Sequence, residues 1–233
     1  MGRLFALLVL GSFSVQAQVF LESFDNGLDQ WSSMRPYSNS SVSVQNGQLG
    51  LRNFGGIVTS PSFSYPYTIS GTFSNYYQRS IFAVTLRSNG NFTYGSALSY
   101  YPDVPSSGGF YGLSILFYAG GYFPNNRVII STDPDYPYAH WQQSVSMAGD
   151  VNFSIFDSGT SLNIEVNGVS LGSFDTTFSR GSMVGLMALE STAYGLNDGI
   201  LVNDIMIIPE PHSSSLLFFG GAILMAARRF RRI

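Results

Sequence analysis

The sequence has 233 residues, of which 45% are hydrophobic and only 11% charged, and all eleven basic residues are arginine. It contains no cysteine, which excludes disulfides, cysteine-ligated zinc and a cysteine nucleophile. Residues 18–208, the body between two unusual termini, carry six arginines against thirteen acids and so a formal charge of −7. That charge disfavours nucleic acid and anionic lipid as partners, and the length suits one domain.

Residues 1–17 have the features of a secretory signal peptide. A short basic start, Met1-Gly2-Arg3, precedes the apolar run 4–10, and Val15-Gln16-Ala17 ends in small residues. We expect signal peptidase to cleave after Ala17 and to leave Gln18 as the first residue. The segment predicts export and is left out of the fold.

The body shows the period-two alternation of β-strands and little helical periodicity. A hairpin is predicted from 42–45 and 48–51, because the Asn46-Gly47 dipeptide between them suits a type I′ turn with positive φ at both positions. A three-stranded meander with a polar outer face is predicted from 151–156, 162–166 and 169–171. Further strands are expected at 67–73, 81–86, 110–118, 127–131, 182–189 and 200–208, with loops at 101–109 and 132–139.

The spacing of the turns predicts an all-β fold, a two-sheet antiparallel β-sandwich. The body also resembles concanavalin A-like (laminin G-like) jelly-roll domains over most of its length. Residues 24–31 look like the opening strand of that family, 42–51 like its first hairpin, and 163–169 like a strand pair near its end. Gly185-Leu186 and 202–207 resemble its closing strands. The resemblance implies a jelly roll, flanked here by an N-terminal signal helix and a C-terminal hydrophobic helix.

Many bacterial members of that superfamily are glycoside hydrolases with Glu-x-Asp-x-Glu on one strand. Retaining hydrolysis needs two carboxyl groups about 5 Å apart, but Glu22, Glu165 and Glu190 are isolated in this body. Asp133 and Asp135 form a close acidic pair that could be calcium ligands, part of a sugar site or a solvated turn. We favour the turn, because calcium takes six or more oxygen ligands and no loop here supplies them.

Histidine offers no better site for catalysis. His140 stands beside Trp141, but no Gly-x-Ser-x-Gly motif supplies a nucleophile, and a metal site usually needs more than one histidine or a cysteine. We interpret His140 as a surface or strand-end residue. The sequence therefore predicts a protein that is not an enzyme, with no catalytic residue, no metal ligand and no cofactor, calcium being left open.

Aromatic residues are the remaining signal in the body. Twelve of the fourteen tyrosines lie between Tyr65 and Tyr138. Aromatic rings can stack on sugar rings, and we single out Tyr136, Tyr138 and Trp141 as candidate stacking residues. The alternative is that tyrosine serves only as a good strand residue with a solvated hydroxyl, and we favour it because β-propensity alone predicts many exposed tyrosines.

The last 25 residues carry three features in a fixed order: Pro209-Glu210-Pro211, the apolar run 216–227, and an arginine cluster. As a helix the apolar run spans about 18 Å at ~1.5 Å per residue, less than the ~30 Å hydrocarbon core of a bilayer. This order resembles the PEP-CTERM sorting signal, which implies processing by an exosortase; a plain C-terminal anchor is the alternative. The signal residues are Pro209, Glu210, Pro211, Arg228, Arg229, Arg231 and Arg232.

The sequence thus predicts a signal peptide (1–17), a β-sandwich domain (18–208) and a sorting tail (209–233). The protein is expected to be exported, tethered to the inner membrane through its C-terminal helix, and then placed at the cell surface or in the matrix. Signal peptidase, an exosortase and extracellular polysaccharide are the expected partners. The leading function is that of a non-catalytic surface or matrix protein that binds or sits within extracellular polysaccharide, and a purely structural or adhesive role and an atypical glycan-active enzyme are the alternatives.

Overall fold

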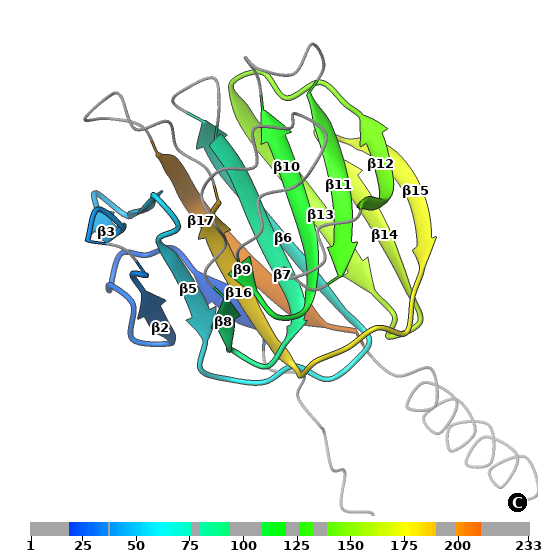
Figure 1. Ribbon diagram of the computed structural model, residues 1–233, viewed down its shortest axis with the longest axis horizontal. Coiled ribbons are helices and arrows are strands. Elements are labelled where there is room, and N and C mark those ends of the chain that lie inside the picture. Colours follow the sequence, from blue (N-terminus) through cyan, green and yellow to red (C-terminus); the bar gives the residue numbers. More distant parts are fainter. Residues whose placement is uncertain are drawn as a thin grey trace, which may run out of the picture.

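In a computed structural model of the chain, the described residues are 19–36, 38–75, 80–93, 109–119, 126–132, 139–189 and 199–210. These residues form strands and no helix, in two antiparallel sheets that lie face to face (Figure 1). The predicted β-sandwich is therefore confirmed. Both predicted terminal helices lie outside the described residues, and no helix within the described part is long and apolar enough to cross a membrane.

The larger sheet has eight strands and a central position for β6. In order, its strands are β15 (Val169–Asp175), β14 (Ser161–Val166), β13 (Asp150–Asp157), β6 (Tyr67–Asn75), β17 (Ile200–Pro209), β4 (Gln48–Arg52) and β3 (Ser41–Gln45), and β1 (Phe20–Glu22) also pairs with β17.

The second sheet has seven strands and lies over the first in Figure 1. In order, its strands are β12 (Ala139–Ser144), β11 (Arg127–Thr132), β10 (Leu113–Ala119), β7 (Ser80–Ser88), β16 (Met183–Ala188), β5 (Gly56–Thr59) and β2 (Trp31–Met34). A separate two-stranded pair is formed by β8 (Phe92–Thr93) and β9 (Gly109–Phe110).

The predicted hairpin and meander are confirmed. Asn46 and Gly47 have φ of 53° and 71°, the positive values that a type I′ turn requires, and they join β3 to β4. Asn167 and Gly168 repeat this arrangement between β14 and β15, at 50° and 76°. Burial alternates strictly along β13 from Asp150 to Asp157, so one side chain in two faces the second sheet.

The main core fills the space between the two sheets. Four phenylalanines at its centre have ring centroids 4.6–6.2 Å apart, close enough for favourable aromatic contacts. They come from four strands, two in each sheet, so the cluster joins the two layers. They are Phe73, Phe82, Phe117 and Phe153.

A second apolar cluster covers the face of the seven-stranded sheet that is turned away from the main core. Phe110 on β9 lies on this face, and two glycines make room for its ring. A Cβ atom at Gly185 would lie 2.5 Å from Phe110 Cδ2, and one at Gly56 would lie 3.2 Å from Cε2. These glycines therefore allow the β8–β9 pair to approach the sheet.

Residues 24–31 do not form the opening strand that the family resemblance implied. The chain makes turns from Phe24 to Gln30, with positive φ at Phe24 and Gly27, and a strand begins only at Trp31. The Asp-Asn-Gly sequence explains this, because these residues favour turns. The opening strand is instead β1, which precedes them. At the other end β17 extends through Pro209, one residue beyond the predicted end of the body.

Candidate functional site

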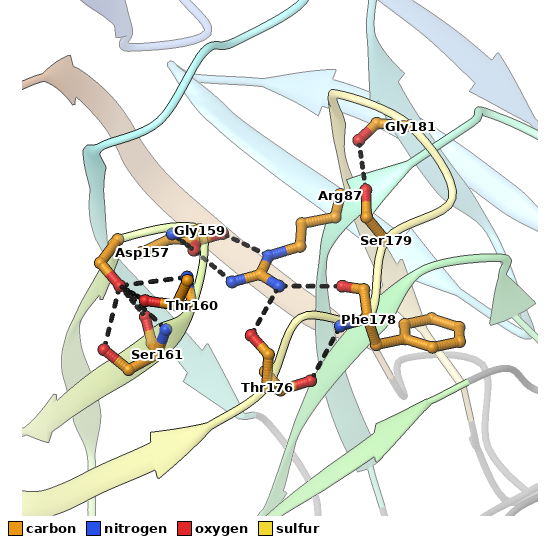
Figure 2. A network of polar contacts seen from close by, with 10 residues as sticks. Arg87, Asp157, Gly159, Thr160, Ser161, Thr176, Phe178, Ser179 and Gly181 are labelled. Carbon is orange, nitrogen blue, oxygen red and sulfur yellow. Dashed lines mark hydrogen bonds and ion pairs between the residues drawn. The ribbon is translucent and has the colours of Figure 1, made fainter.

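The most highly connected polar group in the described residues is the buried ion pair of Arg87 and Asp157 (Figure 2). The Arg87 Nε donates to Asp157 Oδ2 at 3.0 Å, and Nη2 donates to Oδ1 at 2.6 Å. Nη1 donates to the carbonyl oxygens of Thr176 and Phe178, at 3.0 and 2.9 Å. Both side chains have no exposed surface, so a carboxylate and four N–H···O bonds compensate the buried charge.

A local break in strand geometry places Arg87 there. Its φ of 53° is in the left-handed region, and the pairing of β7 with β16 shifts register at this point. Side chains of a regular strand alternate between faces, but Leu86 belongs to the main core between the sheets and its neighbour Arg87 also bonds across to the other sheet. The irregularity therefore lets Arg87 reach β13 of the opposite sheet.

Two tyrosines complete this group, which we call the Arg87 network. The Arg87 guanidinium carbon lies 5.1 Å from the centroid of the Tyr65 ring, and that ring stacks on Tyr67 at 5.7 Å. Burial, followed by the negative charge of Asp157, raises the pKa of Tyr67 well above its ordinary value. Burial disfavours the charged form of Arg87 and by itself would lower its pKa. The hydrogen bond to Asp157 and the negative charge of Asp157 outweigh burial, so the Arg87 pKa is raised. The network has the character of a structural brace at one end of the sandwich.

Other carboxylates in the described residues are also engaged or dispersed. Glu22 is buried and accepts hydrogen bonds from the backbone N–H of Phe24 at 2.8 Å and from Trp31 Nε1 at 3.1 Å. Glu165 is exposed on β14. Within the part of the chain that the structure describes, no three His, Cys, Asp or Glu side chains lie close enough together to hold a metal ion.

A different arrangement lies on the outer face of the seven-stranded sheet, where β10, β11 and β12 meet its edge. Tyr118 pairs with Arg127 in the register of β10 and β11, and the Arg127 guanidinium carbon lies 5.2 Å from the centroid of the Tyr118 ring. Arg127 Nη1 donates to Gln142 Oε1 at 3.4 Å, a long hydrogen bond. We call Tyr118, Arg127 and Gln142 the rim site.

Exposure changes across the rim site. Tyr118 is buried in the second apolar cluster, Arg127 is half-buried, and Gln142 on the edge strand is exposed. The site therefore presents a planar cation and a planar amide to solvent above a buried ring. Guanidinium N–H groups donate, and the amide both donates and accepts, which matches the hydroxyl groups of a neutral polyol better than it matches a cation.

Trp141, the one described member of the predicted stacking set, lies on the opposite face from the rim site. It pairs with Ile130, a main-core residue, and its half-buried ring packs against that core. Gln142 pairs with Ile129, which belongs to the second cluster. Trp141 is thus directed between the two sheets at the open edge, and its stacking role stays a prediction.

The other predicted residues are mostly outside the described part of the chain. Of the sorting signal, Pro209 ends β17, and the Glu210 side chain accepts a hydrogen bond from Thr68 Oγ1 at 2.9 Å. His140 lies in β12. The predicted residues outside the described ranges are Ala17, Gln18, Asp133, Asp135, Tyr136, Tyr138, Pro211, Arg228, Arg229, Arg231 and Arg232.

Sequence reasoning did not select the rim site, although it predicted strands at 110–118 and 127–131. Tyr118 and Arg127 stand at the facing ends of those two predicted strands. Had the two strands been paired as a hairpin, the register would have brought this tyrosine and arginine together. Gln142 gave no separate signal.

The fold described so far is that of a jelly-roll β-sandwich. No family model and no curated protein matches the sequence. Among solved structures, the chain is similar to the exoplasmic/lumenal domain of VIP36 in a Ca²⁺/Man-bound form, with 10% identity, coverage of 85% of this chain and 92% of that one, and a TM-score of 0.58. It is also similar to the carbohydrate recognition domain of Emp47p, with 12% identity, 84% and 96% coverage, and a TM-score of 0.57.

The similarity extends to a bacterial protein. A protein of unknown function with a galectin-like fold from Bacillus subtilis is 9% identical over 82% of this chain and 96% of that one, with a TM-score of 0.55. Identities this low show a shared fold. The jelly roll implied by the sequence resemblance is therefore confirmed.

Proposed function

We propose that this protein is an exported, non-catalytic, carbohydrate-binding protein of the cell surface or extracellular matrix, and that its rim site contacts the sugar. The rim site carries the proposal: an arginine held on a tyrosine ring, next to an exposed glutamine, on a lectin-like sandwich. Two structural neighbours support the same ligand class. The VIP36 structure is of a Man-bound form, and the Emp47p structure is of a carbohydrate recognition domain.

Two of the predicted stacking residues extend the proposal beyond the rim site, whereas the third, Trp141, lies on the other face of the sheet. In the sequence, Tyr136 and Tyr138 fall between Thr132, the last residue of β11, and Ala139, the first residue of β12; Arg127 is at the other end of β11. The six residues of β11 span about 20 Å at ~3.3 Å per residue. A glycan of several sugar units along β11 would contact both ends. This fits a polysaccharide better than a single sugar.

Export and sorting belong to the same proposal. Signal peptidase would remove residues 1–17, and the tail would hold the protein in the inner membrane until an exosortase acts on its PEP-CTERM signal. The body's charge of −7 favours a neutral or cationic polysaccharide over an acidic one. We leave open whether sugar binding depends on calcium, because one VIP36 structure is of a Ca²⁺-bound form.

The test is a glycan-array screen of the full chain in detergent, with and without calcium. We expect saturable binding that Gln142→Ala weakens by about three- to tenfold, the equivalent of ~0.5–1.5 kcal/mol for one hydrogen bond. Gln143→Ala is the matched control, because this exposed neighbour pairs with the main-core residue Val128 and so belongs to the opposite face.

Two further variants separate the parts of the surface. Loss of binding in Tyr138→Ala would support the predicted stacking residues. Loss of binding in Trp141→Ala, which lies on the same face as the control Gln143, would instead place the sugar contact at the open edge between the two sheets. No binding to any glycan at high protein concentration would refute the proposal and leave the structural or adhesive role. Turnover of a bound glycan would instead favour the enzyme alternative.

A further inference from the structure

Both ends of the described chain leave the sandwich side by side. Val19 precedes β1, and β1 runs antiparallel to β17 with Phe20 opposite Ile207. Pro209 at the end of β17 pairs with Tyr67, the residue that also pairs with Asp157 of the Arg87 network. The start of the body, the start of the tail and the Arg87 network therefore share one end of the molecule.

Hydrogen bonds hold Glu210, near the start of the tail, against the sandwich. The backbone N–H of Glu210 donates to the Pro66 carbonyl oxygen at 2.8 Å, and Thr68 Oγ1 donates to the Glu210 side chain at 2.9 Å. Only residues 211–215 separate Glu210 from the apolar run 216–227. Five extended residues span at most about 17 Å.

An apolar patch lies next to this point, on the outer face of the eight-stranded sheet. Leu21 and Val19 are 64% and 51% exposed, and only Val169 is comparable among the large hydrophobic residues of the described part. Leu21 lies directly opposite Met206, and Ile208 follows Met206 two residues later on the same face; Met206 and Ile208 are half-buried. We call Val19, Leu21, Met206 and Ile208 the terminal patch.

We infer that the terminal patch rests on the lipid bilayer while residues 216–227 are inserted in it. The inference rests on the proposed membrane tail. Single exposed apolar side chains need no explanation, but two exposed ones beside two half-buried ones at the attachment point form a patch that does. A short tether keeps the patch at the membrane surface, so weak apolar contacts suffice. The charge of the body directs this contact to zwitterionic lipid.

This orientation has a consequence for the proposed sugar site. Arg127 pairs with Tyr118, Tyr118 pairs with Ile81, and β7 then runs from Ile81 to Arg87 at the tail end. The rim site therefore lies at the far end of the sandwich from the terminal patch. A domain resting on the patch presents its rim site away from the membrane.

The absence of cysteine makes a direct test possible. Ser70→Cys places a fluorophore beside Met206, its pairing partner, and Ser144→Cys places one at the far end, opposite Arg127. The full chain is reconstituted in phosphatidylcholine vesicles that contain a head-group spin-labelled lipid. We expect strong quenching of the fluorophore in the Ser70→Cys variant and little in the Ser144→Cys variant. Adding Val19→Gln and Leu21→Gln to the Ser70→Cys variant should abolish its excess quenching while the protein still floats with the vesicles.

Each other outcome is decisive. Equal quenching at the two positions, or quenching that the two added glutamines leave unchanged, overturns the inference and leaves the tail intact. Failure of the full chain to float with vesicles overturns the membrane tail and this inference together. Self-association that depends on Val19 and Leu21 without any lipid quenching assigns the patch to a second copy of the chain.

Discussion

Two arginines of this domain each lie over a tyrosine ring, and their surroundings differ in almost every other respect. Arg87 lies over Tyr65 at 5.1 Å and Arg127 over Tyr118 at 5.2 Å. Arg87 is buried, donates to both oxygens of Asp157 and to two carbonyls, and joins the two sheets. Arg127 is half-buried at a sheet edge, where an uncharged amide accepts its long hydrogen bond.

The difference separates a structural arginine from one that can bind a ligand. A buried guanidinium must have its charge compensated inside the protein, and the hydrogen bonds that do so leave it nothing to offer a ligand. At an exposed rim, water compensates part of the charge, and a ligand hydroxyl can replace water at little cost. The same residue type on the same kind of ring is therefore structural where it is fully buried, and in our proposal it binds a ligand where it is half-buried.

Arg87→Met is the variant with the largest expected effect. It leaves the Asp157 carboxylate buried without its partner, and breaking a buried pair in this way costs about 3–5 kcal/mol of unfolding free energy. Urea denaturation of the full chain in detergent measures the loss. Adding Asp157→Leu to the same chain removes the unpaired charge and should restore much of the unfolding free energy. A double variant that is no more stable than Arg87→Met alone would contradict the structural role of the Arg87–Asp157 pair.

Arg87→Lys should cost less, because it keeps the charge but loses the two-point contact. A lysine ammonium cannot reproduce the planar fork that donates to both Asp157 oxygens and to two carbonyls. We expect a loss of about 1–3 kcal/mol, the range for unsatisfied buried polar groups. Arg127→Lys is the matched substitution, and as a surface change it should stay within about 0.5 kcal/mol. An equal loss of unfolding free energy for Arg87→Lys and Arg127→Lys would show that the two arginines contribute alike to stability.

The local features of the fold could be read from the sequence. Asn46-Gly47 and Asn167-Gly168 have the turn conformation that their residue types require, and the strands beside them alternate as expected. The Arg87 network could not be predicted in this way. It depends on a left-handed residue that is not glycine and on a partner seventy positions away, and a single sequence carries no signal for either.

The orientation of Trp141 could not be predicted from the sequence either. Ser131 pairs with Ala139, so an unbroken register would place Ile130 opposite His140. An irregularity between β11 and β12 inserts one residue, and Ile130 pairs with Trp141 instead. A shift of one residue moves a side chain to the other face of a sheet. Composition identified an aromatic residue of interest, but only the register shows which face it occupies.

Arg127→Met tests the other half of the comparison. The unfolding free energy should change by no more than about 0.5 kcal/mol, whereas glycan affinity should fall about tenfold, which corresponds to ~1.4 kcal/mol. Binding isotherms on the best ligand of the array give the affinity, and urea denaturation gives the stability. Loss of stability without loss of binding would make Arg127 a second structural arginine.

The smallest expected effect is a dependence of stability on alkaline pH, and it comes from the Arg87 network. The pKa of Tyr67 is raised in the folded protein by burial and by the charge of Asp157, while in the unfolded chain it is close to the ordinary value of about 10. Above that pH the unfolded state loses the Tyr67 proton first, so the folded state binds more protons and its stability falls as pH rises. Thermal midpoints measured from pH 8 upward should therefore be level at first and then decline from about pH 10 toward the folded pKa. Tyr67→Phe should make the decline shallower, whatever its effect at pH 8, and Tyr118→Phe is the matched substitution at the rim. A decline equally steep in Tyr67→Phe and in the unmodified chain would show that deprotonation of Tyr67 does not cause the loss of stability.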